Sequence, residues 1–213
     1  MLIFQIFFKF DKLDIDDIPI YKKSIDQWTE LAKKNNYTYK LYNESDCDDI
    51  LNLYPKYLDF YKNEFNRPIV KHEICRYLIL YLHGGVYIDL DILPTSKDLE
   101  WIETPFFRVD SGRKRGTHYS NDFIALDKGD ERFGLEMIDY CVQQYREKSK
   151  RYLELGWVGR LVLQSTGAYC ISRYIKKNEI PINSFLANCY SSKGIELCKI
   201  QDSNIFVNHT ALW

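Results

Sequence analysis

Paired cysteines at zinc-site spacing are missing from this sequence of 213 residues, because its six cysteines include no CxxC pair. We therefore expect no zinc site. Several cysteines lie within apolar patterns, where a free thiol behaves as a small hydrophobe. The simplest interpretation is a protein of a reducing compartment.

Long apolar runs are also missing. No stretch reaches the ~18 apolar residues of a membrane-spanning helix, because Arg76 and His83 interrupt the best candidate. The first ten residues are apolar but lack the basic segment and the small-residue cleavage site of a signal peptide. We expect a soluble cytoplasmic protein without a transmembrane segment, with a strand at its start.

The net charge of −1 argues against nucleic acid as the main partner. A hydrophobic fraction of 46% and a charged fraction of 28% are ordinary for a globular protein. The chain has neither an internal repeat nor a linker-like segment, so one domain over residues 1–213 is expected. Its oligomeric state is left open.

The most informative segment is 67–95, RPIVKHEICRYLILYLHGGVYIDLDILPT. The uninterrupted run from Pro68 to His83 predicts a helix, and the glycine pair after it suits a helix C-terminus. The β-branched stretch 86–93 then predicts a strand. Because side chains alternate along a strand, Asp89 and Asp91 would share one face, roughly 6 to 7 Å apart.

Two carboxylates on one face of a buried strand end are costly without a cation. A hard divalent cation such as Mg²⁺ or Mn²⁺, with a substrate phosphate completing its shell, would relieve that cost. The alternative interpretation is a pair of solvated residues at a strand end.

The remaining pattern predicts helices alternating with strands. The order β-α-β at the start favours parallel strands with a crossover helix. The basic stretch SGRKRGTHYS within 95–120 is expected to be a loop, either a solvated turn or a lid that meets an acceptor. The other expected elements are strands at 2–8, 37–42 and 121–126, helices at 18–35, 45–65 (two, joined near Pro55), 130–148 and 166–177, and a tail strand followed by a hook.

The central segment resembles the DXD glycosyltransferases of family 32 and the sugar-transferring domains of bacterial glucosylating toxins. The matching residues are Glu73 and Arg76, an apolar run, Gly84-Gly85, an apolar-aromatic pair and the motif Asp89-Leu90-Asp91. The compact length resembles the glycosyltransferases that chlorella viruses encode. Only residues 69–94 match densely, and Glu73 stands where the family usually has Asp.

Weaker similarities lie elsewhere in the chain. They are Gln5 within FQIF, Asn121 at the start of a strand, Thr166-Gly167-Ala168, and the tail from His209 to Trp213. The resemblance implies a single-domain GT-A fold of the α/β class, with a mixed, mostly parallel sheet flanked by helices. Residues 1–94 would form the nucleotide-binding half, and 95–213 the acceptor half with a C-terminal hook.

The activity implied is a retaining transfer of a hexose from a nucleotide-sugar donor to a glycan or glycoprotein acceptor, with Mn²⁺ or Mg²⁺. UDP-glucose is favoured as the donor, and GDP-mannose is the main competitor. If the chain is virus-encoded, the host cytoplasm is its expected location.

The resemblance also assigns residues. The catalytic set is Asp89, Asp91, Arg76 and Glu73. Asp91 would bind the metal directly, Asp89 would reach the ribose and the metal, and His209 or Asn208 would supply a third ligand. The donor-binding set adds Gln5 and Phe7 at the base, Asn121 near the sugar, and Trp213 over the phosphate or sugar.

Each assignment has a structural alternative. Phe7 could be ordinary core, Glu73 and Arg76 a surface ion pair, and His209 an exposed tail residue. Two other functions are less favoured alternatives. One is a DxD phosphohydrolase, although Leu93 stands where that chemistry needs Thr or Val. The other is a non-catalytic sugar-nucleotide-binding module.

Overall fold

The computed structural model describes residues 1–9, 14–94, 97–100, 102–112, 116–183, 186–192, 195–200 and 203–208; side chains at 110–117 and from 184 onward are not described. The first half contains β1 (Leu2–Ile6), α1 (Pro19–Lys34), β2 (Thr38–Tyr42), α2 (Glu44–Asn52), α3 (Pro55–Asp59), α4 (Pro68–His83), β3 (Gly85–Ile88) and β4 (Ile92–Leu93). Short turns of 3-10 helix (Ile15–Asp17) and π-helix (Phe60–Glu64) precede α1 and follow α3.

The second half begins with β5 (Phe106–Gly112) and β6 (Gly116–Leu126). The helices α5 (Leu135–Glu154), α6 (Val158–Ser165) and α7 (Ala168–Lys177) follow. The chain ends with β7 (Leu186–Ser192), β8 (Ile195–Ile200) and β9 (Ser203–Asn208). No helix in the described ranges is long and apolar enough to cross a membrane.

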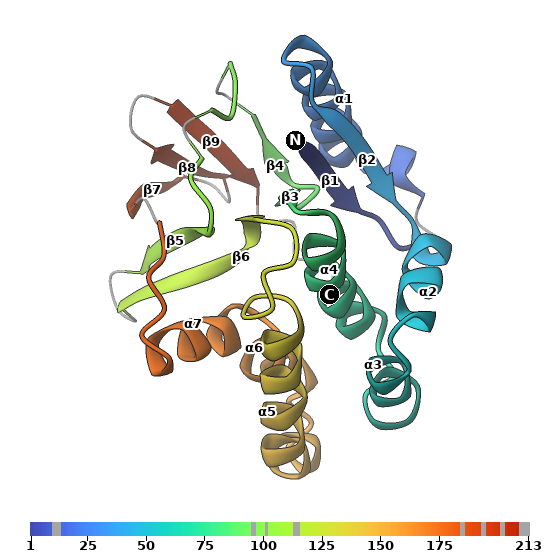
Figure 1. Ribbon diagram of the computed structural model, residues 1–213. Helices are drawn as coiled ribbons and strands as arrows, with labels where there is room; N and C mark the ends of the chain where they lie inside the picture. Colours follow the sequence, from blue (N-terminus) through green and yellow to red (C-terminus); the bar gives the residue numbers. More distant parts are fainter. Residues whose placement is uncertain are drawn as a thin grey trace.

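The strands are ordered β2-β1-β3-β6-β5-β7-β8-β9-β4, and the first five form the central mixed sheet (Figure 1). The predicted α/β class and mixed sheet are confirmed. The prediction that the sheet is mostly parallel is wrong, because among the strands that the structure describes only the pairs β2-β1, β1-β3 and β5-β7 are parallel. The strands β5 and β6 are close in sequence and pair antiparallel, since a short connection cannot join parallel neighbours.

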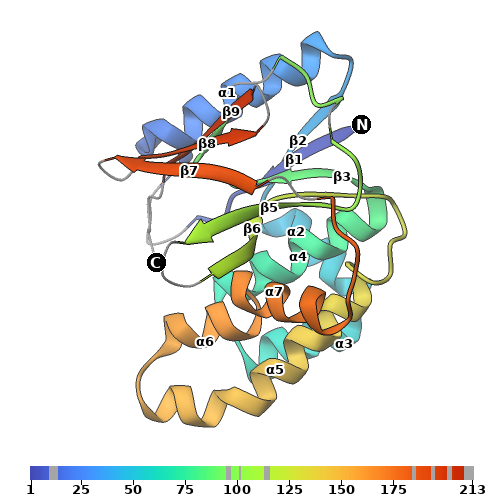
Figure 2. The same cartoon turned by 90° about the vertical axis from the view of Figure 1, so that its left-hand side faces the viewer.

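Helices cover both faces of the central sheet, as Figures 1 and 2 show. On one face, Ile3, Val86 and Phe123 of the strands pack with Trp28 of α1. On the other, strand residues that include Phe4, Tyr87 and Ile124 pack with α2 to α5 and α7. This alternation follows the two-residue period of strands and explains why adjacent strand residues belong to different clusters.

The glycine pair after α4 is needed for close packing of β3. Gly84 ends the helix with a φ of 66°, and Gly85 has a φ of 105°. A Cβ on Gly85 would lie 2.3 Å from the Leu2 carbonyl oxygen of β1. Only glycine therefore allows β3 to start in register beside β1.

Three sequence predictions need correction. The strand expected at 86–93 is broken, because residues 89–91 form a turn between β3 and β4. Much of the loop expected for the stretch SGRKRGTHYS (111–120) is strand, since β5 and β6 extend to residues 112 and 116 on either side of the basic run. The helix expected at 130–148 starts at Leu135 and continues to Glu154.

Candidate active site at the DXD turn

The DXD residues lie in a tight turn at the end of β3. The Asp89 N–H donates to the Asp122 carbonyl at 2.8 Å, which extends the β3–β6 ladder by one residue. The Ile92 N–H then donates to the Asp89 carbonyl at 3.2 Å and closes the turn. The Leu90 side chain is buried between the two aspartates. The motif is thus a turn anchored by its central apolar residue, and simple strand alternation does not describe it.

Three buried side chains beneath the turn, those of Gln5, Ser24 and Trp28, hold both of its ends. The Gln5 amide nitrogen donates to the Asp89 carbonyl at 3.2 Å. The Ser24 hydroxyl and the Trp28 indole both donate to the Ile92 carbonyl, at 2.7 and 2.8 Å. Because an unpaired buried carbonyl is costly, these bonds stabilise the turn.

Gln5, which the sequence resemblance places at the edge that would hold the donor base, contacts the DXD turn from below. Its side chain is fully buried. The amide nitrogen also donates to Ser24 at 3.0 Å, and the amide oxygen accepts from the Tyr39 hydroxyl at 2.8 Å. With its amide engaged in these bonds, Gln5 supports Asp89 from below.

Asp89 is held from the opposite side. Its carboxylate accepts a hydrogen bond from the Tyr87 hydroxyl and pairs with Arg76 at 3.4 Å. The Arg76 guanidinium also lies over the Tyr87 ring, with its carbon 4.2 Å from the ring centroid. A third of the Asp89 side chain remains exposed, so one side of the carboxylate is open to a ligand.

Arg76 is the buried centre of this cluster. It pairs with Glu73 at 3.1 Å, donates to the Asn121 carbonyl at 2.5 Å and contacts His72 Nδ1 at 3.2 Å. The spacing of three residues does place Glu73 and Arg76 on one face of α4, as predicted. Both are buried, so the alternative of a surface ion pair is wrong.

The protonation of His72 and Glu73 follows from burial. Burial and the adjacent Arg76 charge lower the pKa of His72 to about 3, so its ring is neutral. Since Nδ1 faces Arg76, we assign the proton to Nε2, which lies 3.4 Å from the Ile6 carbonyl. Burial raises the pKa of Glu73 to about 7, with Asp89 adding to the shift and Arg76 opposing it.

Asn121 joins this cluster from β6. Its side-chain amide donates to the Glu73 carboxylate at 2.7 Å, while its carbonyl accepts from Arg76. The structure thus brings together Glu73, Arg76, Asp89 and Asn121, which the sequence predicted as site residues from separate segments.

The site contains a second buried arginine that the sequence pattern does not predict. Arg108 of β5 donates from Nε to the Asp122 carboxylate at 2.8 Å, and its side chain is almost fully buried. Asp122 follows Asn121 on β6 and raises the pKa of Asp91. The sequence does contain a basic and an acidic residue that could pair across neighbouring strands. It does not predict the β5–β6 hairpin that brings Arg108 and Asp122 together.

The charges around the turn suit a divalent cation. With all four carboxylates ionised, Glu73, Asp89, Asp91 and Asp122 would exceed the charges of Arg76 and Arg108 by two, and a bound cation would favour that ionised state. Burial, followed by the charges of Asp89 and Asp122, raises the pKa of Asp91 to about 8.

Asp91 forms no ion pair within the part of the chain that the structure describes. Its half-buried carboxylate is therefore available to a hard cation. The described side chains include no group of three or more metal-binding residues. The residues fit Mg²⁺ or Mn²⁺, with further ligands coming from a bound phosphate or from other parts of the chain.

The tail strand lies beside this turn in the backbone register. β9 pairs with β4, with Ile92 opposite Val207. Continuing this antiparallel register places Asn208 opposite Asp91. His209 and Trp213, the predicted metal ligand and donor cover, lie outside the described residues, as does the Asn208 side chain.

Phe7 follows β1 directly and is half-buried, and its ring lies 6.4 Å from that of Tyr21 on α1.

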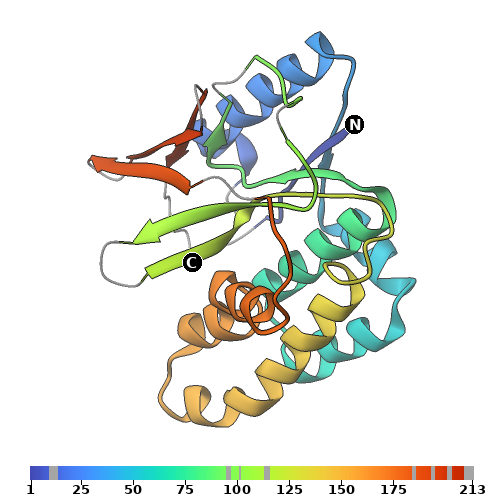
Figure 3. The ribbon, with the colours of Figure 1, turned by 60° about the vertical axis from the view of Figure 1, so that its left-hand side comes forward.

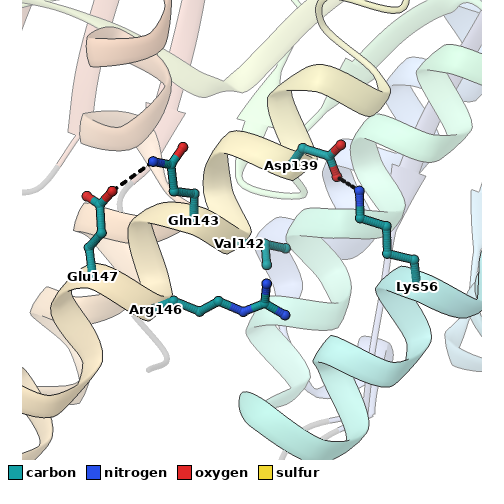
Figure 4. A pocket seen from close by; sticks show the side chains of 6 residues that line it. All are labelled: Lys56, Asp139, Val142, Gln143, Arg146 and Glu147. Carbon is teal, nitrogen blue, oxygen red and sulfur yellow. Dashed lines mark hydrogen bonds and ion pairs between the residues drawn. The ribbon is translucent and has the colours of Figure 1, made fainter.

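A shallow pocket lies between α3 and α5 (Figure 4). It is lined by Lys56, Asp139, Val142, Gln143, Arg146 and Glu147. None of the predicted site residues lines it, so it is separate from the DXD turn.

Comparison with known proteins agrees with this geometry. Residues 17–107 match the model of the glycosyltransferase sugar-binding region containing the DXD motif. The mannosyl phosphorylinositol ceramide synthase CSH1 of Saccharomyces cerevisiae is 34% identical over 82 residues, which are 36% of this chain. The match spans 20% of the yeast protein's length.

The PaToxG structure shows the fold. The PaToxG glycosyltransferase superposes with a TM-score of 0.54 at 19% identity, over 84% of this chain and 69% of that one. The UDP-bound glycosyltransferase domain of the YGT toxin is more distant, with a TM-score of 0.46 at 11% identity over 80% of this chain and 57% of that one. The likeness to the PaToxG glycosyltransferase confirms the GT-A-like fold inferred from the sequence resemblance.

The matched region contains α4, the glycine pair and the DXD turn, which contribute Glu73, Arg76 and Asp89 to the charged cluster. Residues 17–107 of this chain are thus similar to the DXD-containing sugar-binding region of glycosyltransferases.

Proposed function

We propose that the chain is a metal-dependent retaining glycosyltransferase that moves a hexose from a nucleotide-sugar to a glycan or glycoprotein acceptor. The observation that carries this proposal is the packing of Glu73, Arg76 and Asn121 against Asp89 of the DXD turn. These groups combine directional hydrogen bonds for hydroxyls with carboxylates for a cation that binds phosphate.

Different residues are proposed to bind the metal-diphosphate part and the sugar part of the donor. Asp91, with an open carboxylate, is the proposed metal ligand, and Asp89 is proposed to bind the donor ribose beside it. When bound, Mn²⁺ or Mg²⁺ would neutralise the negative charge that develops on the departing diphosphate. His209 and Asn208 stay the candidates for a further ligand, because β9 runs beside the turn.

Glu73 and Arg76 are proposed to bind the sugar and ribose hydroxyls. Buried, mutually oriented charged groups lose little rotamer freedom when a ligand arrives, so they can hold the sugar at a fixed angle. Asn121 orients Glu73 and adds an amide near the same position. Trp213 remains the proposed cover over the donor, and Phe7 the proposed contact with the base.

The donor proposed first is UDP-glucose, from the sequence resemblance to the toxin and viral enzymes. GDP-mannose is the second candidate, and the name of the yeast relative, a mannosyl phosphorylinositol ceramide synthase, favours mannose. A phosphohydrolase is less favoured because Asp89 is bonded to Tyr87 and Arg76, which stabilise its charge and would weaken a nucleophile.

The direct test is titration of the protein with UDP-glucose, UDP-galactose and GDP-mannose by calorimetry, in Mn²⁺ and then in EDTA. We expect Mn²⁺-dependent binding of one donor and slow release of its nucleoside diphosphate. Binding of GDP-mannose alone would replace the proposed donor. Binding that is unaffected by EDTA would contradict the metal-dependent mechanism, and binding without diphosphate release over an acceptor panel would favour a non-catalytic module.

A further inference from the structure

The corner between α5 and α6 gathers most of the strongly exposed apolar side chains of the described chain. The large apolar residues with at least 46% exposure are Met1, Leu53, Leu153, Leu155, Trp157 and Leu163. Four of these six lie between residues 153 and 163. Scattered exposed apolar residues are normal, but a contiguous group indicates a contact surface.

The backbone gives this corner a defined shape. Helix α5 ends at Glu154, and Gly156 turns the chain with a φ of 68°. The Trp157 N–H donates to the Tyr152 carbonyl at 2.8 Å, and the two rings lie 6.4 Å apart. The exposed indole is therefore held in place at the start of α6. Figures 2 and 3 show the α5–α6 connection at the outer end of the helical layer.

Unpaired cations surround the apolar side chains. Lys150, Arg151 and Arg160 are exposed. None of the three forms an ion pair with a residue that the structure describes. The Arg160 guanidinium lies 5.4 Å from the Trp157 ring centroid, so apolar and basic groups share one stripe of α6. Glu154 is the acidic residue between them, and the corner is positively charged in a chain whose net charge is −1.

We propose that this corner docks onto an anionic lipid surface. Leucine and tryptophan side chains on a protruding turn can enter the interface between headgroups and acyl chains, while lysine and arginine meet the anionic headgroups. Four partly exposed side chains form a small patch, whereas a stable protein–protein interface needs ~800 Å² per partner. The combination of a small apolar tip and a basic rim therefore fits a membrane surface better than a second protein.

The proposal is independent of the proposed function, and its test needs no catalytic readout. The full chain is sedimented with vesicles of phosphatidylcholine alone, and with vesicles that also contain phosphatidylserine. We expect binding to the anionic vesicles, weakened by raised salt. A triple variant with Lys150→Gln, Arg151→Gln and Arg160→Gln should lose roughly a hundredfold in partitioning, since each cation contributes about fivefold near such a surface.

A second triple variant, with Leu153→Ser, Leu155→Ser and Trp157→Ser, should bind at least tenfold more weakly. Leu53→Ser is its matched control, because Leu53 is 67% exposed and lies apart from the corner. Replacement of the basic run at 113–115 with glutamine is the charge control. Both controls should bind like the unmodified chain, and an unchanged circular dichroism melt verifies the fold of each variant.

Three results would overturn the proposal. One is no preference for anionic vesicles at low salt. Another is an equal loss of binding in Leu53→Ser or in the 113–115 variant. The third is concentration-dependent self-association that the apolar triple variant abolishes, without vesicle binding, which would assign the corner to a contact between two copies of the chain.

Discussion

The side-chain amide of Asn121 on β6 donates a 2.7 Å hydrogen bond to the Glu73 carboxylate on α4. The two residues are separated by the whole DXD segment in sequence. Their contact ties the second half of the chain to the sugar-binding helix, because the Asn121 carbonyl also accepts from Arg76. A single asparagine thus connects both charged members of the α4 pair to the central sheet.

Asn121→Ala should remove this connection and lower the stability of the folded chain. The buried Glu73 carboxylate would lose one of its hydrogen-bond donors, which typically lowers the free energy of unfolding by about 1 to 3 kcal/mol. Urea denaturation should show a lower midpoint with an unchanged slope. The control is Asn63→Ala, because Asn63 makes an exposed bond to Asp59. Equal losses in the two variants would mean that the Asn121 contact contributes nothing specific.

The Arg108–Asp122 pair should behave as a coupled buried unit. Arg108→Met leaves the Asp122 carboxylate without this partner in a buried setting, and breaking such a pair typically costs about 3 to 5 kcal/mol. Adding Asp122→Leu removes the carboxylate that Arg108→Met leaves without this partner. We expect the double variant to be more stable than the sum of the single losses predicts, as measured by chemical denaturation. Strict additivity would show that the two side chains do not interact energetically.

The ionisation of Glu73 should lower the free energy of unfolding as the pH rises from about 4.5 to about 7. Its pKa rises from 4.5 to about 7 on folding, mainly through burial. Across this range the folded chain keeps a proton that the unfolded chain loses. The stabilising contribution is therefore complete below pH 4.5 and is lost as the pH rises through 7, by an amount on the order of 3 kcal/mol.

The measurement is urea denaturation of the unmodified chain and of Glu73→Gln at pH 5 and pH 8. The unmodified chain should lose more stability than the variant on going to pH 8. Glu64→Gln is the control, because Arg146 holds the pKa of Glu64 below its usual value and its charge does not change in this range. Parallel pH profiles for Glu73→Gln and the unmodified chain would contradict the raised pKa.

The sequence predicted the parts of the fold that depend on local patterns. Helix α4 runs from Pro68 to His83 as expected, because proline at its start and glycine at its end are local signals. Glu73 and Arg76 were placed on one face for the same reason. The break after Ile88 could not be read from the pattern, because Leu90 continues the apolar alternation while tertiary hydrogen bonds from Gln5 and to Asp122 form the turn.

The missed elements depend on pairing between distant segments. The β5–β6 hairpin carries a basic, glycine-containing sequence that resembles a loop, yet its strands pair in the sheet. Arg108 and Asp122 meet only through that pairing. Likewise, the burial of Gln5 depends on Ser24 and Tyr39, which come from α1 and β2.

Turnover by Asp91→Asn in Mn²⁺ tests the central claim most directly. The amide keeps the shape of Asp91 but removes the charge that the cation needs, while the fold rests on Leu90 and the bonds to the turn backbone. Asp49→Asn, at an exposed position on α2, is the matched control. We predict that Mn²⁺-dependent release of nucleoside diphosphate falls at least a hundredfold in Asp91→Asn alone, with an unchanged circular dichroism melt. Full Mn²⁺-dependent release by Asp91→Asn would contradict the account.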